Sequence, residues 1–154
     1  NLLLNFPLNT HGALDAEEQK ILAAITAWME INGEAIQGTR PWRIFGEGPN
    51  ITKAVPGQKY NESNRKDFTF EDVRFTTKGK TLYAFFMGWP EQGKVTIPAL
   101  AQSRPYVAGK IERVRILGGK KLSWTHDSGG LAVELPSAKP CEFGCVLKIE
   151  GLET

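Results

Sequence analysis

The chain has 154 residues, of which 41% are hydrophobic, enough for one domain with a buried core or for one domain and part of another. Nineteen basic residues against seventeen acidic residues leave a net charge of +2, which is too small to indicate a nucleic acid or another polyanion as a partner. The longest apolar run is far shorter than a membrane span, and the sequence contains no recognisable signal peptide.

The first five residues, Asn-Leu-Leu-Leu-Asn, form an apolar run without alternation. This pattern predicts a strand buried on both faces, as in a parallel sheet covered by helices. Such a strand needs neighbours to satisfy its backbone hydrogen bonds, and the sequence offers none before it. We therefore expect residues 1–40 to be the last strand and helix of a larger α/β domain whose other elements lie outside this chain.

A helix is predicted from about Ala16 to Asn32. Asp15 is a favourable N-cap, and Glu18 follows three residues later, as in a capping box. Gly33 is a suitable residue to end the helix. One apolar face should pack against other elements or, if uncovered, favour self-association of the chain. The stripe on this face consists of Ile21, Leu22, Ile25, Trp28, Met29 and Asn32.

Glycine and proline interrupt any period in residues 34–66, and we interpret residues 41–66 as an irregular connection between domains. From residue 67 to 154 the apolar residues alternate in short runs separated by turn residues, which predicts an antiparallel two-sheet β-sandwich. The expected fold is therefore mainly β, a sandwich preceded by one strand and one helix of an α/β domain. Strands are predicted at 68–70, 73–76, 82–87, 94–97, 111–117, 121–124, 131–135 and 143–149.

Alternation along these strands also predicts which side chains are buried, because every second residue of a half-buried strand faces the core. Arg113 and Arg115 should face solvent by the same argument. The side chains expected in the core are Phe75, Leu82, Ala84, Val114, Ile116, Trp124, Val133, Cys145, Leu147 and Ile149.

The two cysteines, Cys141 and Cys145, are four residues apart in a predicted strand. A continuous strand would place their Cα atoms roughly 13 Å apart, whereas a disulfide requires less than about 7 Å. We expect both to be reduced and unpaired unless the strand breaks between them. No further cysteine or histidine lies nearby, so the spacing is a weak signal for a metal, and no metal site is predicted.

The acidic residues do not form a convincing catalytic pair. Glu17 and Glu18 are explained by helix capping, and Glu71 and Asp72 would point to opposite faces of a strand. Glu47, flanked by two glycines, is the more interesting candidate, although its carboxylate would more simply accept backbone N–H groups of a tight turn.

Histidines and aromatic residues are the remaining candidates for a site. His11 and His126 have no partners at the spacing of a catalytic triad or a metal site. Three aromatic side chains could stack on sugar rings if they were exposed, but would more commonly lie in the core. These three are Trp89, Tyr106 and Trp124.

Residues 32–42, Asn-Gly-Glu-Ala-Ile-Gln-Gly-Thr-Arg-Pro-Trp, resemble the NGEAIYGTRPW segment of the α-L-fucosidases, a retaining glycoside hydrolase family with a (β/α)8-type catalytic barrel. The opening residues 1–5 resemble that family's last barrel strand. Further similarity to the family lies in residues 45–49 and, at the start of its C-terminal β-sandwich, in residues 73–79, 82–84 and 88–90. The chain departs from the family at Gln37, where tyrosine is usual, and in the loop of residues 5–9.

The resemblance implies that this chain is the C-terminal part of an enzyme that removes terminal α-L-fucose from glycans with retention. The family's aspartate nucleophile and glutamate acid/base would lie upstream of Asn1, so no catalytic residue is assigned here, and the substrate-binding residues stay unknown. The missing barrel would be the intramolecular partner, no cofactor is implied, and the location would be secreted, periplasmic or lysosomal. The alternatives are a carbohydrate-binding module, which an exposed aromatic platform would favour, and a purely structural domain.

Overall fold

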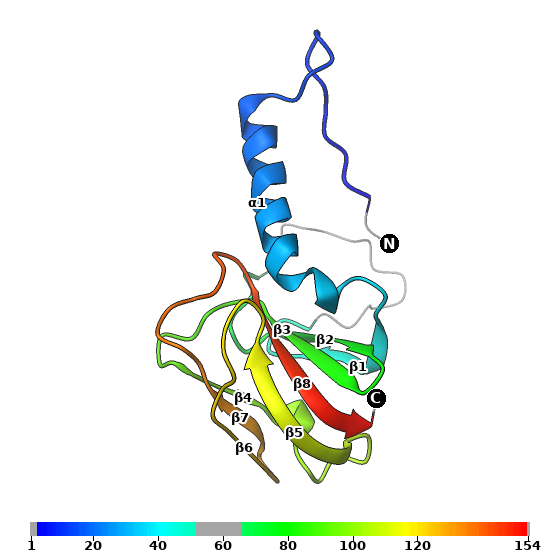
Figure 1. Ribbon diagram of the computed structural model, residues 1–154, viewed down its shortest axis with the longest axis vertical. Helices are drawn as coiled ribbons and strands as arrows, with labels where there is room; N and C mark the ends of the chain where they lie inside the picture. Colours follow the sequence, from blue (N-terminus) through cyan, green and yellow to red (C-terminus); the bar gives the residue numbers. More distant parts are fainter. Residues whose placement is uncertain (1–2, 52–65, 154) are drawn as a thin grey trace.

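Two antiparallel sheets lie face to face, and one helix stands on the outer side of the larger sheet (Figure 1). The computed structural model describes residues 3–51 and 66–153. Its elements are α1 (Ala16–Asn32), η1 (Gly33–Ala35), β1 (Arg40–Glu47), β2 (Val73–Lys78), β3 (Thr81–Phe86), β4 (Lys94–Ile97), η3 (Pro98–Leu100), β5 (Ala108–Ile116), β6 (Trp124–Asp127), β7 (Gly130–Glu134) and β8 (Cys145–Glu153).

The larger sheet has the strand order β1-β2-β3-β8-β5, and the smaller sheet has the order β4-β7-β6. All neighbouring strands run antiparallel, so the predicted two-sheet sandwich is confirmed. The short hairpin at Gly79 joins β2 to β3, with Lys78 paired to Thr81. Strand β3 is covered on both faces, by the main core on one side and by the cluster under α1 on the other, which explains why its sequence is almost entirely apolar.

The faces of β3 and β8 contribute to two different cores. Leu82, Ala84 and Phe86 point between the sheets, where they join the main hydrophobic core. Tyr83 and Phe85 point the other way and belong to a smaller cluster under the helix. The smaller cluster is completed by Ala35, Leu117 and Val146, with Trp28, Ile31 and Met87 packed against it.

The burial predicted from alternation is confirmed for nine of the ten side chains, each at most 3% exposed, whereas Trp124 is half-buried. Arg113 and Arg115 lie on the outer face, with side chains 60% and 43% exposed. Register therefore agrees with the sequence pattern on β2, β3, β5, β7 and β8. Phe143, of the same parity as Cys145, precedes β8 and is 56% exposed.

Helix α1 has the predicted bounds and start. Asp15 accepts hydrogen bonds from the backbone N–H groups of Glu17 and Glu18, both at 2.9 Å, and the Glu18 side chain completes the capping box. At the other end, Gly33 keeps right-handed helical dihedral angles (φ −58°, ψ −28°), and the chain continues into η1. The helix is thus specified locally at its N-terminus, while its C-terminus is shaped by packing.

The apolar stripe of α1 is packed against the sandwich only along its last turns, so the expected self-association through its uncovered first turns stays a prediction. Ile21 is 53% exposed and Leu22 is 41% exposed, whereas Trp28 and Met29 are half-buried. Figure 1 shows the reason: α1 rises from the sandwich, and the end of α1 nearest η1 lies against the larger sheet.

Three expectations were wrong. Residues 3–5 of the predicted first strand are irregular and exposed, in keeping with the lack of a neighbouring strand, and residues 1–2 lie outside the described part. Residues 40–47, expected to be irregular, form β1; a register shift between Pro41 and Gly46 hides the period of two. Residues 68–70 lie in a turn region before β2 rather than in a strand.

Candidate functional site: an apolar groove beside the helix

A groove of about 550 Å³ runs between α1 and the outer face of the larger sheet. The Trp28 ring stacks on Phe85, with centroids 6.4 Å apart and planes 25° from parallel. The Trp28 indole N–H donates a hydrogen bond of 2.6 Å to the carbonyl oxygen of Gly144. The residues lining the groove are Ile21, Ala24, Ile25, Trp28, Phe85, Phe86, Met87, Phe143 and Gly144.

The lining residues carry no ionisable side chain, so the groove supplies no general acid, base or nucleophile. Exposed apolar surface of this kind is typical of an interface rather than of a reaction centre. Ile21 and Phe143, 53% and 56% exposed, form part of its rim. The groove is therefore suited to receive an apolar surface of another structural unit.

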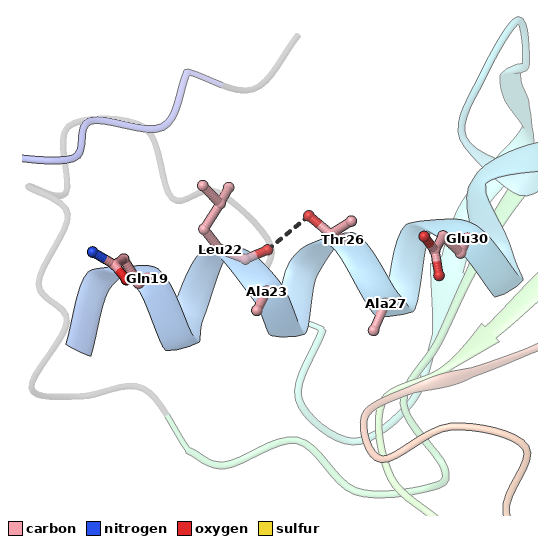
Figure 2. A pocket seen from close by; sticks show the side chains of 6 residues that line it. All are labelled: Gln19, Leu22, Ala23, Thr26, Ala27 and Glu30. Atoms are coloured by element: carbon pink, nitrogen blue, oxygen red, sulfur yellow. Dashed lines mark hydrogen bonds between the residues drawn. The ribbon is translucent and has the colours of Figure 1, made fainter. Parts of the chain in front are cut away.

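The opposite side of α1 also carries a shallow hollow, of about 450 Å³. Figure 2 shows that its lining side chains all come from the helix, with Ala23 and Ala27 leaving space between longer neighbours. Thr26 Oγ1 donates a 2.9 Å hydrogen bond to the Leu22 carbonyl oxygen, which satisfies its one donor within the helix. Small residues let a neighbouring element approach a helix closely, so both sides of α1 have the character of packing surfaces.

The segment before β8 supports one wall of the groove and corrects the expectation for the cysteines. Cys141 lies in an irregular segment and Cys145 begins β8, so the strand does break between them. Their Sγ atoms are 3.4 Å apart, and both are free thiols. Burial, together with the hydrogen bond to Cys141, raises the pKa of Cys145 to about 12.

An acidic side chain fastens η1 to the outer face of the larger sheet. Glu34 Oε2 accepts a 2.8 Å hydrogen bond from Lys148 Nζ, and Glu34 Oε1 lies 3.8 Å from Arg115 Nη2. The Tyr83 hydroxyl lies 3.5 Å from the same Oε2 atom. Burial and the nearby Glu34 carboxylate both raise the pKa of Tyr83. This cluster positions the end of the helix rather than a substrate.

Glu47 makes the backbone contact expected of a structural carboxylate. Its Oε2 accepts a 2.8 Å hydrogen bond from the backbone N–H of Ala99 in η3, which links the edge of the larger sheet to the smaller sheet's β4 connection. Burial raises the pKa of Glu47, against the opposing effects of the Ala99 N–H and the Arg104 charge. None of the contacts described for Glu47 is with a second carboxylate, so these contacts do not form the pair of carboxylates that glycoside hydrolysis requires.

Asp72 is buried, and Glu71 beside it is exposed, so these carboxylates do not act together. Asp72 accepts hydrogen bonds from the backbone N–H and the side-chain amide of Asn50 at 3.0 and 2.9 Å. It also accepts from the backbone N–H of Thr69 at 2.9 Å. Burial opposes ionisation, but these donors together lower the pKa of Asp72 below its ordinary value.

Among the described residues, neither histidine belongs to a group of potential metal ligands. His11 lies in the loop before α1, and His126 lies in β6, at opposite ends of the molecule (Figure 1). His126 Nε2 is 2.7 Å from the Leu100 carbonyl oxygen, which accounts for its position. The three candidate aromatic residues are half-buried and packed against the main core, so they form no exposed platform for sugar rings. These are Trp89, Tyr106 and Trp124.

Comparison with known proteins identifies the sandwich. The sequence model of the α-L-fucosidase C-terminal domain matches residues 65–150, more than half of the chain. The chain belongs to this family. The match spans β2 to most of β8 and thus includes the whole smaller sheet and every strand of the larger sheet except β1.

Relatives of the α-L-fucosidase family align with nearly all of the chain. Tissue α-L-fucosidases of Macaca fascicularis and Homo sapiens are each 32% identical over 157 residues, and the Mus musculus protein is 34% identical over 154 residues. The alignments cover 99%, 99% and 97% of this chain but 28% of each relative. The chain therefore spans less than a third of the length of these curated relatives.

Solved structures of α-fucosidases share the fold. A Thermotoga maritima α-fucosidase, crystallised with a mechanism-based inhibitor, has a TM-score of 0.68 at 24% identity, covering 97% of this chain and 30% of that one. The α-L-fucosidase isoenzyme 1 from Paenibacillus thiaminolyticus has a TM-score of 0.63 at 23% identity, covering 100% of this chain and 31% of that one. The arrangement of helix and sandwich is thus that of a known enzyme architecture.

Sequence reasoning missed two features of this α-L-fucosidase domain. The ion pair between Glu34 and Lys148 joins residues 114 positions apart, and no local pattern indicates such a contact. The meeting of Cys141 with Cys145 had a signal, because Pro140 and Gly144 are residues that interrupt a strand. Among the described residues, no helix is long and apolar enough to cross a membrane.

Proposed function

We propose that this chain is the C-terminal part of an α-L-fucosidase that hydrolyses terminal α-L-fucose from glycans with retention of configuration. The observation that carries the proposal is the alignment of almost the whole chain with about a quarter of each tissue α-L-fucosidase. Within the enzyme, the sandwich would have an accessory, structural role. The catalytic carboxylates would lie upstream of Asn1, and the reaction of this family requires no cofactor or metal.

The groove and the outer side of α1 support a docking role toward an upstream catalytic barrel. In this proposal residues 1–40 complete that barrel, residues 41–66 connect the domains and residues 67–154 form the sandwich, with β1 of the connection joined to the larger sheet. The exposed apolar residues of this region would be covered in the longer protein; in their absence the chain would tend to associate with itself. They include Leu3, Leu4, Ile21, Leu22 and Phe143.

The glycan substrate, and a secreted, periplasmic or lysosomal location, belong to the same proposal, and relatives called tissue and plasma α-L-fucosidase support it. A glycan-binding module without catalysis is the other function considered. No described residue favours it, because the candidate aromatic side chains pack against the core.

Hydrolysis of an aryl α-L-fucoside tests the assignment. The purified 154-residue chain should give no turnover, whereas the longer protein from the same gene should release α-L-fucose as the first product. Turnover by the short chain at the rate of the longer one, in a preparation free of contaminating enzyme, would contradict the accessory role. A longer protein without fucosidase activity would contradict the function itself.

A substitution on the helix tests the docking role separately. Ile21→Lys places a charge on a side chain that is 53% exposed in this chain, so the stability of the short chain should hardly change. In the longer protein the same charge would be buried against the barrel, and the melting temperature and activity should fall. Thr125→Lys, on the exposed side of β6, is the control and should change neither protein. Equal effects of Ile21→Lys on both proteins would reject the docking surface.

A further inference from the structure

Two thiols meet at the wall of the groove. Cys145 is 2% exposed at the first position of β8, and Cys141 is half-buried in the segment before it. Their Sγ atoms are 3.4 Å apart, and each lies 3.5 Å from the carbonyl oxygen of Phe143. The five-residue segment Cys-Glu-Phe-Gly-Cys therefore folds back so that both thiols point to the same place.

We propose that Cys141 and Cys145 form a redox pair that closes into an intramolecular disulfide by exchange with a low-molecular-weight disulfide such as oxidised glutathione. The sulfur atoms need to approach by little more than 1 Å to reach the bond length of about 2.05 Å. A metal is a poorer explanation of the pair, because no group of three or more ligand-type residues is found in the part of the chain that the structure describes.

The two thiols differ in access, which sets the order of the exchange. The thiolate of half-buried Cys141 attacks one sulfur of the reagent disulfide, forms a mixed disulfide and releases the first reagent thiolate. Cys145 then loses its proton to solvent and attacks Cys141 Sγ, which releases the second reagent thiolate. Two electrons pass from the cysteine pair to the reagent, whose disulfide is reduced to two thiols.

The second step becomes easier once the first has occurred. Burial, followed by the hydrogen bond and the charge of Cys141, raises the pKa of Cys145. When Cys141 is held in a mixed disulfide, it no longer carries a thiol or thiolate, so its side-chain hydrogen bond and its charge no longer raise the pKa of Cys145, while burial still raises it and the Cys141 backbone and the Lys139 charge still lower it. The reduced pair is thus protected from random oxidation at Cys145, while a captured reagent is passed on within the pair.

Closure of the pair would act on the helix, because the same segment carries its anchor. Gly144, between the two cysteines, accepts the 2.6 Å hydrogen bond from the Trp28 indole. Asn32 Nδ2 lies 3.7 Å from Cys141 Sγ. A disulfide would hold this segment in a narrower range of conformations and so fix the point at which α1 contacts the sandwich.

Equilibration of the 154-residue chain with reduced and oxidised glutathione tests the proposal. Samples are quenched in acid, free thiols are alkylated, and the chain is cleaved after Glu142, which separates the cysteines onto two peptides. The oxidised chain should be lighter by two hydrogen atoms and should yield the two peptides joined by a disulfide. In the folded chain the equilibrium constant should exceed that in denaturant by a factor of roughly ten or more, because the fold already holds the sulfur atoms together.

Single variants separate the two roles. Cys145→Ser should stop at the mixed disulfide of Cys141 with glutathione, and Cys141→Ser should stay unmodified while the chain is folded, as circular dichroism would verify. If the folded Cys141→Ser variant formed a mixed disulfide with glutathione and the Cys145→Ser variant did not, the assigned order of attack would be overturned. The proposal would be overturned if the equilibrium constant were no larger in the folded chain than in denaturant, or if disulfides formed only between two chains. This measurement uses the unsubstituted chain, so it remains valid even if the Cys145→Ser variant does not fold.

Discussion

Replacing Leu147 with alanine should lower the free energy of unfolding by about 3–4 kcal/mol. Leu147 is 0% exposed and lies on β8 between its Cα partners Ala84 of β3 and Ile116 of β5. The substitution removes three carbon atoms, whose transfer from water is worth about 2.4 kcal/mol at roughly 0.8 kcal/mol each. The neighbouring strands are fixed by hydrogen bonds on both sides, so the cavity cannot close fully, and its cost brings the loss into the range of about 2–5 kcal/mol.

Urea unfolding followed by circular dichroism measures this loss. The midpoint should fall while the slope of free energy against urea concentration stays unchanged, which shows that the unfolded state is not altered. Leu3→Ala is the matched control, because Leu3 is 84% exposed and its truncation should change stability by less than about 0.5 kcal/mol. A loss below about 1 kcal/mol for Leu147→Ala would mean that β8 can repack, and the reasoning from its rigid neighbours would fail.

Three further substitutions test contacts outside the main core. Asp72→Asn should cost about 1–3 kcal/mol at neutral pH, measured in thermal melts. The pKa of Asp72 is lowered in the folded state, so its carboxylate contributes stability that is present above the unfolded-state pKa and lost as pH falls through the folded-state pKa. The variant should therefore lose less stability than the original chain when the solution is acidified. Gly118→Ala should destabilise the chain more than Gly79→Ala does, as urea titrations would measure. Both glycines have positive φ, 72° and 57°, so both substitutions introduce backbone strain. The new Cβ at position 118 would also lie 2.7 Å from Ile31 Cγ2, whereas no atom lies within 4 Å of the new Cβ at position 79. Glu34→Gln should lower the free energy of unfolding by less than about 1 kcal/mol, because the Glu34 side chain is 41% exposed and solvent screens its ion pair. Added salt should reduce the difference in stability between the variant and the original chain. A larger loss that does not depend on salt would contradict this screened ion pair.

Local sequence signals predicted the elements that are specified by residues close together in the chain. The start of α1 follows from the capping box at Asp15, and the hairpin at Gly79 follows from a glycine between two alternating runs. Alternation also gave the correct facing of β5, where Val114 and Ile116 are buried and Arg113 lies outside. The prediction for β5 succeeds because successive side chains of a strand point to opposite faces, so the period of the apolar pattern reports directly which face is buried.

Elements defined by distant partners escaped prediction. Strand β1 pairs with β2 across 26 to 37 positions, and the register shift after Pro41 removes the alternation that would have marked it. The cysteine pair depends on where β8 begins, and one strand boundary decides whether the sulfur atoms are far apart or 3.4 Å apart. Boundaries depend on packing and on loop geometry, and periodicity does not encode either.

The helix shows what an apolar stripe does and does not specify. Its pattern predicts which side of α1 is covered, and the structure shows that the sandwich covers only the part from Trp28 to Asn32. Ile21 and Leu22, on the same stripe, extend beyond the sandwich and are exposed. A single stripe thus serves two surfaces along its length, and the change from covered to exposed along α1 marks where the sandwich ends and where the proposed catalytic barrel would begin.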